Sequence, residues 1–268
     1  MKLNLIALTI INAFLISCNG KEQSTEIETS FQNKGHELVY EMVQRVGDYN
    51  TLANHKDVVY SYKYQTPDGK ADISTEKYVF DGELSYGAYQ PHERTLANLE
   101  GPIEQGYDGK EYWLKHKGKI ITDTTSLKRV AFNRPTNFYW FTMFQKLLDP
   151  GLNYEYIGEK TVNDNAYDIV KITFESAEDR ATDIYQIYIN KDTKLVDQFL
   201  FTVVDAGVID TPMLMELEYE QIEDLLIPTK RRYKKSTWEA EVSDEPWITV
   251  DWSNIKFNND LSRELFKK

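Results

Sequence analysis

Phe138-Tyr139-Trp140-Phe141-Thr142-Met143-Phe144-Gln145-Lys146-Leu147-Leu148 is an apolar run in a chain that otherwise alternates short apolar and polar segments. Pro135 precedes the run and Pro150-Gly151 follows it, a placement that favours a helix of about 13 residues. Apolar residues would cover nearly the whole circumference of this helix. Such a helix must be enclosed on several sides or face an apolar ligand. The run therefore predicts a fold that wraps around a helix.

Two further helices are predicted from the spacing of apolar residues. Thr124–Asn133 has the spacing of a short helix, and Arg134-Pro135 is expected to separate it from the apolar helix. Between residues 36 and 46, apolar residues recur every four positions, which predicts a helix with one buried face. The helix-forming stretches thus lie at the start and in the middle of the chain.

The remaining segments have the pattern of short β-strands. In residues 58–64 a valine and three tyrosines alternate with other residues on one face, and residues 66–69 (TPDG) follow as a turn. Asp108-Gly109 lies between two strand-like segments and predicts a hairpin. About ten or more strands with tight connections predict an antiparallel meander.

The N-terminus resembles the signal of a bacterial lipoprotein. Cys18 is the only cysteine and ends the sequence Leu15-Ile16-Ser17-Cys18, while Lys2 supplies a positive start. The apolar stretch between them is shorter than the roughly 20 residues that span a bilayer. The resemblance implies that residues 1–18 are a removable signal peptide. It also implies that Cys18 becomes an N-terminus carrying diacylglycerol and an N-acyl chain such as palmitate.

The composition limits the partners and the domain organisation. Residues 19–32 are polar and predict a flexible tether, and residues 33–268 are expected to form a single domain. A net charge of −12 disfavours a nucleic-acid partner and adsorption to anionic lipid, so membrane contact is expected through the anchor. The single cysteine leaves no internal disulfide, and the 41% hydrophobic content can supply a core. We expect a monomer.

The order of the predicted elements resembles the superfamily of the lipoprotein carrier LolA and its lipid-anchored acceptor LolB. A leading helix, a run of strands, a helical insertion at residues 124–148 and more strands follow one another over about residues 33–258. The phrases Tyr78–Glu83, Gly106–Trp113 and Tyr188–Thr193 resemble uncharacterised envelope lipoproteins of this type. The resemblance implies an α+β fold. In it, a single large curved antiparallel sheet, a half-open β-barrel, wraps around the inserted helices.

The resemblance also implies an apolar cavity between the concave sheet and the inserted helices, able to hold acyl chains or another lipid. Ligand sites are usually lined by hydrophobic and aromatic side chains with few polar groups. The expected lining residues of the insertion and of the strands are Phe132, Phe138, Tyr139, Trp140, Phe141, Met143, Phe144, Leu147, Trp113, Phe199 and Phe201. The alternative is that these side chains fill the core and leave no room for a ligand.

The sequence departs from the carrier pattern in two respects. The carrier family places an arginine on its sheet to hold the closed lid, but Arg94, Arg129, Arg134 and Arg180 are all expected in loops or at helix ends. A protruding loop with an exposed leucine, as in the acceptor, is also not found. The sequence therefore predicts lipid binding rather than a direct role in lipoprotein sorting.

Motifs for catalysis or for metal and cofactor binding were not found. The four histidines are widely separated, and the only thiol would carry the anchor. Acidic residues 175, 178, 179 and 183 around Arg180 are expected to be a solvated loop. The basic run Lys230–Lys235 is expected to pair across strands with Glu216, Glu218 and Glu220. We predict neither an enzyme nor a cofactor or metal site.

These observations predict a lipid-anchored protein of a Gram-negative cell envelope that binds a lipid or a lipoprotein acyl group without catalysing a reaction. Asn19 follows the cysteine in place of the aspartate associated with inner-membrane retention in some bacteria, which favours the outer membrane. The alternative function is a structural or interaction module with a filled core, which docks on an envelope protein or glycan.

Overall fold

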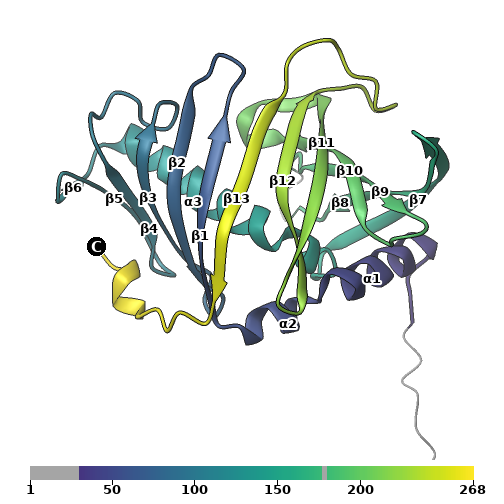
Figure 1. Cartoon of the computed structure of the whole chain (residues 1–268), viewed down its shortest axis with the longest axis horizontal. Coiled ribbons are helices and arrows are strands. Elements are labelled where there is room, and N and C mark those ends of the chain that lie inside the picture. The colour runs from purple at the N-terminus through teal and green to yellow at the C-terminus, as the bar shows by residue number, and fades with distance from the viewer. Residues whose placement is uncertain (1–29, 177–179) are drawn as a thin grey trace, which may run out of the picture. The chain divides into compact units, whose positions relative to one another are not determined.

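One antiparallel sheet forms most of the fold. Over residues 30–176 and 180–268, which the computed structural model describes, thirteen strands pair in the order β6-β5-β4-β3-β2-β1-β13-β12-β11-β10-β9-β8-β7 (Figure 1). The strands are β1 (Asp57–Gln65), β2 (Ala71–Val79), β3 (Leu84–His92), β4 (Ile103–Tyr107), β5 (Tyr112–His116), β6 (Lys119–Ile121), β7 (Leu152–Val162), β8 (Asn165–Phe174), β9 (Ile184–Asn190), β10 (Val196–Val203), β11 (Val208–Ile222), β12 (Leu225–Lys235) and β13 (Ile248–Phe257). The predicted antiparallel meander and the predicted fold class are confirmed.

Three α-helices lie on one side of this sheet. They are α1 (Lys34–Val46), α2 (Tyr49–Asn54) and α3 (Thr124–Lys146), and two short 3-10 helices, η1 (Val204–Ala206) and η2 (Arg263–Phe266), follow later in the chain. Residues 31–268 form one compact unit. The predicted signal peptide and Cys18 lie outside the residues that the structure describes, as does most of the predicted tether.

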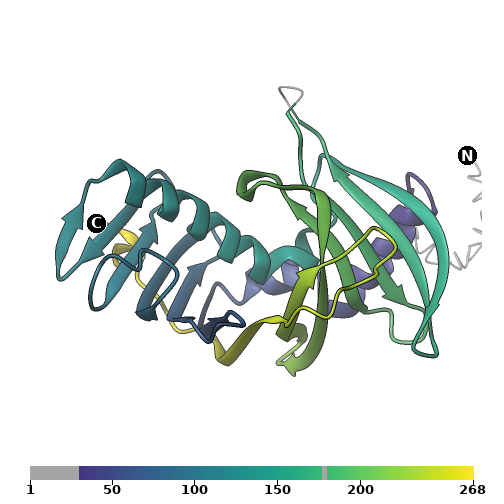
Figure 2. The same cartoon turned by 90° about the horizontal axis from the view of Figure 1, so that it is seen from above.

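The position of α3 follows from the strand order. The first six strands step outward from β1 to the edge strand β6, and the next seven step inward from the opposite edge strand β7 to β13, which pairs with β1. The segment between β6 and β7 must therefore cross the sheet. At 1.5 Å per residue, the 23 residues of α3 span about 35 Å. Figure 2 shows α3 running along the inner face of the sheet from one half to the other.

The prediction of two helices separated at Arg134-Pro135 is wrong, because α3 is continuous and Pro135 lies inside it. A proline inside a helix removes one backbone hydrogen bond and crowds the preceding turn. Packing on both sides of Pro135 outweighs this cost. Arg134 is fully buried against β2, and one turn later Phe138 is also buried.

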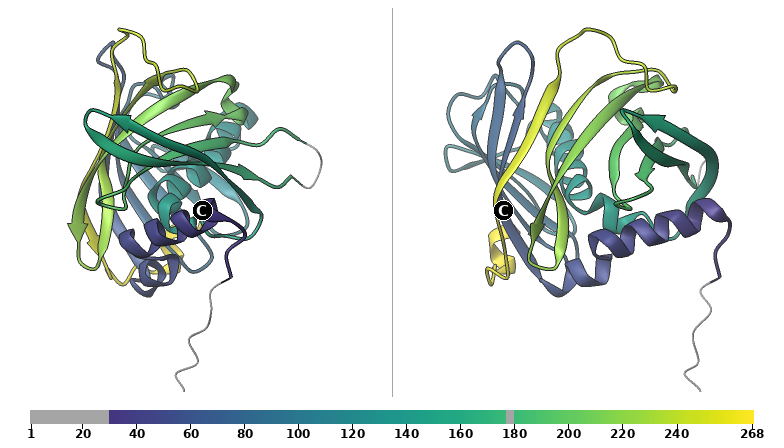
Figure 3. Two further views of the ribbon diagram at one scale, coloured as in Figure 1. Left: turned by 90° about the vertical axis from the view of Figure 1, so that its right-hand side faces the viewer. Right: turned by 45° about the vertical axis from the view of Figure 1, so that its right-hand side comes forward.

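The leading helix is confirmed, with a buried face of mainly apolar residues. Its N-terminus is capped by Asn33, whose side chain accepts a hydrogen bond from the backbone N–H of His36 at 3.1 Å, and Gly47 ends it at a φ of 91°. Figure 3 shows α1 lying beneath the curled strands β7–β13. The short helix α2 that follows was not predicted from the sequence.

Aromatic rings join α3 to the middle of the sheet. Phe141 on α3 is stacked on Tyr60 of β1 at a centroid distance of 5.0 Å and on Trp252 of β13 at 5.3 Å. All three side chains are buried in the main core. Because β1 and β13 are the strands at which the two halves of the sheet meet, Phe141 fixes the helix at that seam.

A buried ion pair fixes the first half of α3. Arg134 Nη1 lies 2.8 Å from Glu76 Oε2 on β2, and neither side chain is exposed. Glu76 also accepts hydrogen bonds from Ser74 at 2.6 Å and Tyr78 at 3.1 Å. Burial alone would lower the pKa of Arg134, but the charge of Glu76 holds that pKa above its usual value.

Gly87 on β3 provides the space for this ion pair. A Cβ atom at Gly87 would lie 2.6 Å from Arg134 Nη1 and 2.8 Å from Glu76 Oε1. Both distances are too short for a side chain to fit. The close approach of the guanidinium to the strand therefore requires glycine at this position.

We expect Arg134→Met to destabilise the protein by about 3–5 kcal/mol, because it leaves the carboxylate of Glu76 buried without a counter-charge. The double variant Glu76→Met/Arg134→Met removes both charges and is expected to recover much of that loss. Urea unfolding gives the free energies, with Arg45→Met at an exposed position as the control. A double variant less stable than either single variant would contradict this interpretation.

Candidate functional site

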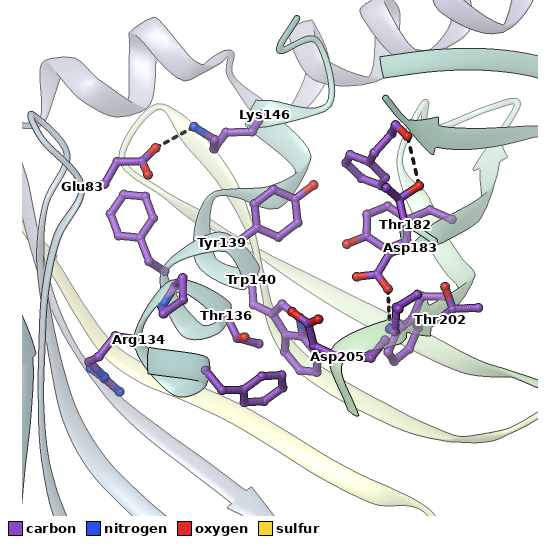
Figure 4. Close-up of a pocket in the computed structure, with 18 of the residues that line it drawn as sticks. Glu83, Arg134, Thr136, Tyr139, Trp140, Lys146, Thr182, Asp183, Thr202 and Asp205 are labelled. Carbon is purple, nitrogen blue, oxygen red and sulfur yellow. Dashed lines mark hydrogen bonds and ion pairs between the residues drawn. The ribbon is translucent and has the colours of Figure 1, made fainter. Parts of the chain in front are cut away.

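A cavity of about 620 Å³ lies beside α3 and is lined by residues of both halves of the sheet, including Ser85, Tyr107 and Tyr112 of β3, β4 and β5. The helix contributes an apolar wall of Phe132, Pro135, Phe138, Tyr139 and Trp140. Across the cavity lie residues of β8, β9 and β10 and of the segments next to them, which are Phe174, Ala181, Thr182, Asp183, Tyr185, Phe201, Thr202, Val203, Val204 and Asp205. Figure 4 shows Tyr139 and Trp140 on the helix, with Asp183 and Thr202 opposite.

A second cavity of about 320 Å³ adjoins the first. Both volumes fall within the range of ligand pockets, roughly 300–1,000 Å³. The residues that line both cavities are Phe132, Thr136, Trp140, Phe201 and Val203. We call these five residues the shared wall and the two cavities together the hollow. Trp140 and Phe132 in the shared wall are only partly buried.

The structure brings together five of the residues expected to line a cavity, namely Phe132, Phe138, Tyr139, Trp140 and Phe201. The other residues expected at the site line neither cavity. Those in the main core are Phe141, Met143, Phe144, Leu147 and Phe199. Trp113 belongs to a separate cluster with Leu84, Tyr86 and Phe266, and its indole N–H donates to the carbonyl of Phe266 at 2.6 Å.

The lining of the larger cavity includes the acidic residues Glu83, Asp183 and Asp205. Lys146 Nζ lies 2.8 Å from Glu83 and 3.1 Å from Asp149, so its charge is balanced within the protein. Asp183 accepts a hydrogen bond from the backbone N–H of Val204 at 2.7 Å. Burial raises the pKa of Asp183, and the nearby negative charge of Asp205 adds to this effect.

The smaller cavity carries arginines. The guanidinium of Arg94 lies 3.8 Å from the centroid of the Tyr64 ring, and that of Arg129 lies 5.5 Å from the centroid of the Phe132 ring. Asp72 is the acidic residue of this cavity. Its carboxylate is buried and accepts hydrogen bonds from the backbone N–H groups of Arg94 and Thr95.

Arg231 is a functional candidate that the sequence analysis missed. It lies on β12, where its Nη2 donates to the backbone carbonyl of Trp140 at 2.9 Å and its guanidinium covers the Trp252 ring at 3.8 Å. Burial lowers the pKa of Arg231 to about 10. An arginine on the sheet thus holds the helix backbone. The basic run concealed this residue, although strand alternation places it on the face opposite Lys230 and Arg232.

Two other expectations about arginines can now be compared with the structure. Arg129 and Arg134 were expected at helix ends, which is wrong because the single helix α3 contains both. On the outer side of β12, two of the three predicted cross-strand pairs are confirmed: Lys230 lies 3.4 Å from Glu218, and Arg232 contacts Glu216. The third is wrong, because Glu220 lies opposite Ile227.

The acidic residues around Arg180 are only partly covered by the structure. Glu178 and Asp179 lie outside the described residues, whereas Asp183 lines the larger cavity. Within residues 30–176 and 180–268, no group of three or more His, Cys, Asp or Glu side chains is placed to hold a metal ion. In the same residues, none of the helices combines the length and the apolar character needed to cross a membrane.

Comparisons with known proteins found one matching family model and several solved structures with a similar fold. A model of a family of unknown function, DUF6503, matches residues 107–211. No curated protein matches the chain. A DUF1329 family protein from Desulfovibrio piger is similar over 87% of this chain and 95% of its own, at 16% identity and a TM-score of 0.54.

Two further solved structures are similar over nearly their whole length. A putative outer membrane lipoprotein-sorting protein domain from Vibrio parahaemolyticus matches 87% of this chain and 96% of its own, at 10% identity and a TM-score of 0.50. The chain shares its fold with this domain. A LolA superfamily protein from Nitrosomonas europaea matches 87% and 97%, at 11% identity and a TM-score of 0.49.

The partly buried carboxyl of Asp183 in the larger cavity predicts a pH dependence. Because the pKa of Asp183 is raised in the folded state, its stabilising contribution is complete below the ordinary value of 3.8 and is lost as the pH rises through the folded-state pKa. We expect Asp183→Asn to raise the melting temperature at about pH 7 and to have little effect at about pH 3.5. Thermal unfolding at both pH values measures this, with exposed Asp210→Asn as the control. An equal effect at the two pH values would contradict the assignment.

Proposed function

We propose that this protein is a lipid-anchored protein of the bacterial cell envelope and that the hollow binds a lipid or a lipoprotein acyl group. The observation that carries the proposal is the aromatic hollow beside α3, with partly exposed Trp140 and Phe132 in its shared wall. Apolar side chains that face a cavity rather than the core gain burial when an apolar ligand covers them.

The size and chemistry of the hollow suit a hydrocarbon chain. Burying each methylene group of a ligand contributes about 0.8 kcal/mol, so a chain of about ten carbons supplies enough free energy to offset the cost of association. Aromatic rings of the helix and of β10 supply the contact surface. Trp140 and Phe201 lie edge to face at a centroid distance of 6.1 Å, which gives the wall a defined shape.

Lysine and acidic groups of the larger cavity take part in interactions within the protein. Lys146 is engaged by Glu83 and Asp149, and Asp183 accepts from the backbone of Val204. These groups position the loops around the cavity. Binding of an acyl chain needs no nucleophile and no proton transfer, and we propose a binding protein rather than an enzyme.

The location is proposed from the N-terminus. Residues 1–18 would be removed as a signal peptide, Cys18 would carry the acyl chains, and the polar residues 19–32 would let the domain stand off the bilayer. Asn19 after the cysteine supports an outer membrane location. The similarity to a putative outer membrane lipoprotein-sorting protein domain agrees with this proposal at the level of the fold.

We expect Trp140→Asp to weaken binding of the apolar dye N-phenyl-1-naphthylamine by about tenfold, because it places a carboxylate in the shared wall. Fluorescence titration of residues 19–268 measures the affinity. The loss of stability should stay below about 2 kcal/mol, whereas Phe144→Asp in the filled core should cost several kcal/mol.

Trp247→Asp is the matched control, because Trp247 packs beside Arg232 and Lys234 outside the hollow. It should leave the dye affinity unchanged. If the native protein bound no dye, or if Trp140→Asp and Trp247→Asp had the same affinity for the dye, acyl binding would be contradicted. A docking module with a filled core would then be the better proposal for the function.

The proposed anchor makes a separate prediction. Cys18→Ala in the full-length chain should abolish incorporation of radiolabelled palmitate and move the protein from the membrane fraction to the soluble fraction. Ser17→Thr, which keeps the thiol, serves as the comparison. Membrane association of Cys18→Ala at the level of the native chain would refute lipid anchoring through this residue.

A further inference from the structure

The two cavities of the hollow carry opposite charges. The larger cavity has Glu83, Asp183 and Asp205 around it, and its two cations, Lys146 and Arg134, are neutralised by ion pairs. The smaller cavity has Arg94 and Arg129. In a protein with a net charge of −12, these two arginines against the one carboxylate of Asp72 give the lining of the smaller cavity a local excess of positive charge.

Arg94 is poorly satisfied within the protein. Its side chain is 27% exposed, and its Nη1 lies 3.7 Å from Asp72 Oδ2, close enough for an ion pair but beyond hydrogen-bond distance. Asp72 instead accepts three backbone hydrogen bonds, which hold the loop after β3. The face of the guanidinium rests on Tyr64 and orients its N–H groups, since a cation over a ring still has its in-plane donors available.

Arg129 has even fewer interactions. Among residues 30–176 and 180–268, it contacts the ring of Phe132 but forms no ion pair with a carboxylate. It lies on α3 one turn before the shared wall. A guanidinium with free donors at one end of an apolar pocket matches a planar or tetrahedral anion.

We propose that the ligand is a single-chain amphiphile with an anionic head, whose carboxylate or phosphate is bound by Arg94 and Arg129. Its hydrocarbon chain lies along Trp140 and Phe201 and extends into the larger cavity. This inference rests on the proposed acyl-binding function. The direction of the chain follows from charge, because an anionic head at the other end would face Glu83, Asp183 and Asp205.

Binding of three probes with the same chain length tests this proposal. Isothermal titration calorimetry of residues 19–268 measures the affinities for dodecanoate, dodecyl phosphate and dodecanol. These probes carry a carboxylate, a phosphate and a neutral head group. We expect at least one of the two anions to bind about tenfold more tightly than dodecanol. Whichever of dodecanoate and dodecyl phosphate binds more tightly identifies the preferred head group. Added salt should reduce this preference.

Arg94→Gln/Arg129→Gln should reduce the preference for the anion to below about threefold while leaving the affinity for dodecanol unchanged. Arg45→Gln removes the same charge from an exposed position at the end of α1 and should leave the preference intact. If the double variant does not fold, Arg129→Gln alone should weaken binding of the anion by about threefold.

The outcomes separate this inference from the proposed function. Failure of all three probes to bind would overturn both. Equal affinity of the native chain for all three, or an anion preference that survives the double substitution, would overturn the anionic head while leaving acyl binding in place. Inorganic phosphate that binds as tightly as dodecyl phosphate would also overturn the inference, because the chain would then contribute nothing.

Discussion

The requirement that α3 cross the sheet from β6 to β7 governs the rest of the structure. The sheet curves around the second half of the helix, where α1 and α2 also lie beside it, whereas Thr124, Lys128 and Pro135 in its first half are exposed. This explains why apolar residues surround the second half. The ion pair of Arg134 with Glu76 fixes its first half, and Phe141 fixes it at the seam between β1 and β13.

The hollow arises where the sheet curves away from the fixed helix. The first half of α3 packs on β3, β4 and β5, whereas the second half faces strands that curl around it. Side chains of one helix therefore meet different surroundings. Phe141 and Phe144 point into the filled core, whereas Tyr139 and Trp140 line the larger cavity. The same geometry separates the arginines of the smaller cavity from the acidic groups of the larger one.

Local patterns were sufficient to predict the strands and the sheet, because alternation and turn residues act over a few positions. Local patterns failed where contacts between residues far apart in the sequence determine the structure. Arg134 and Glu76 lie 58 positions apart, and nothing near Pro135 indicates that this ion pair keeps the helix continuous. Helical spacing grouped Phe141 with Trp140, but which of them meets a cavity depends on β10 and β13. Arg231 was concealed within a basic run whose neighbours pair on the outer face.

The pairing of β1 with β13 has a consequence for biosynthesis. The first strand acquires its second neighbour only after every other strand has been made, so the pairing of β1 with β13 waits until the end of synthesis. Folding that depends on such distant contacts is slow. Until β13 has been synthesised, the apolar interior is exposed to solvent. The nascent chain is then most vulnerable to aggregation and proteolysis. A chaperone that shields this partly folded intermediate would have its greatest effect at that stage.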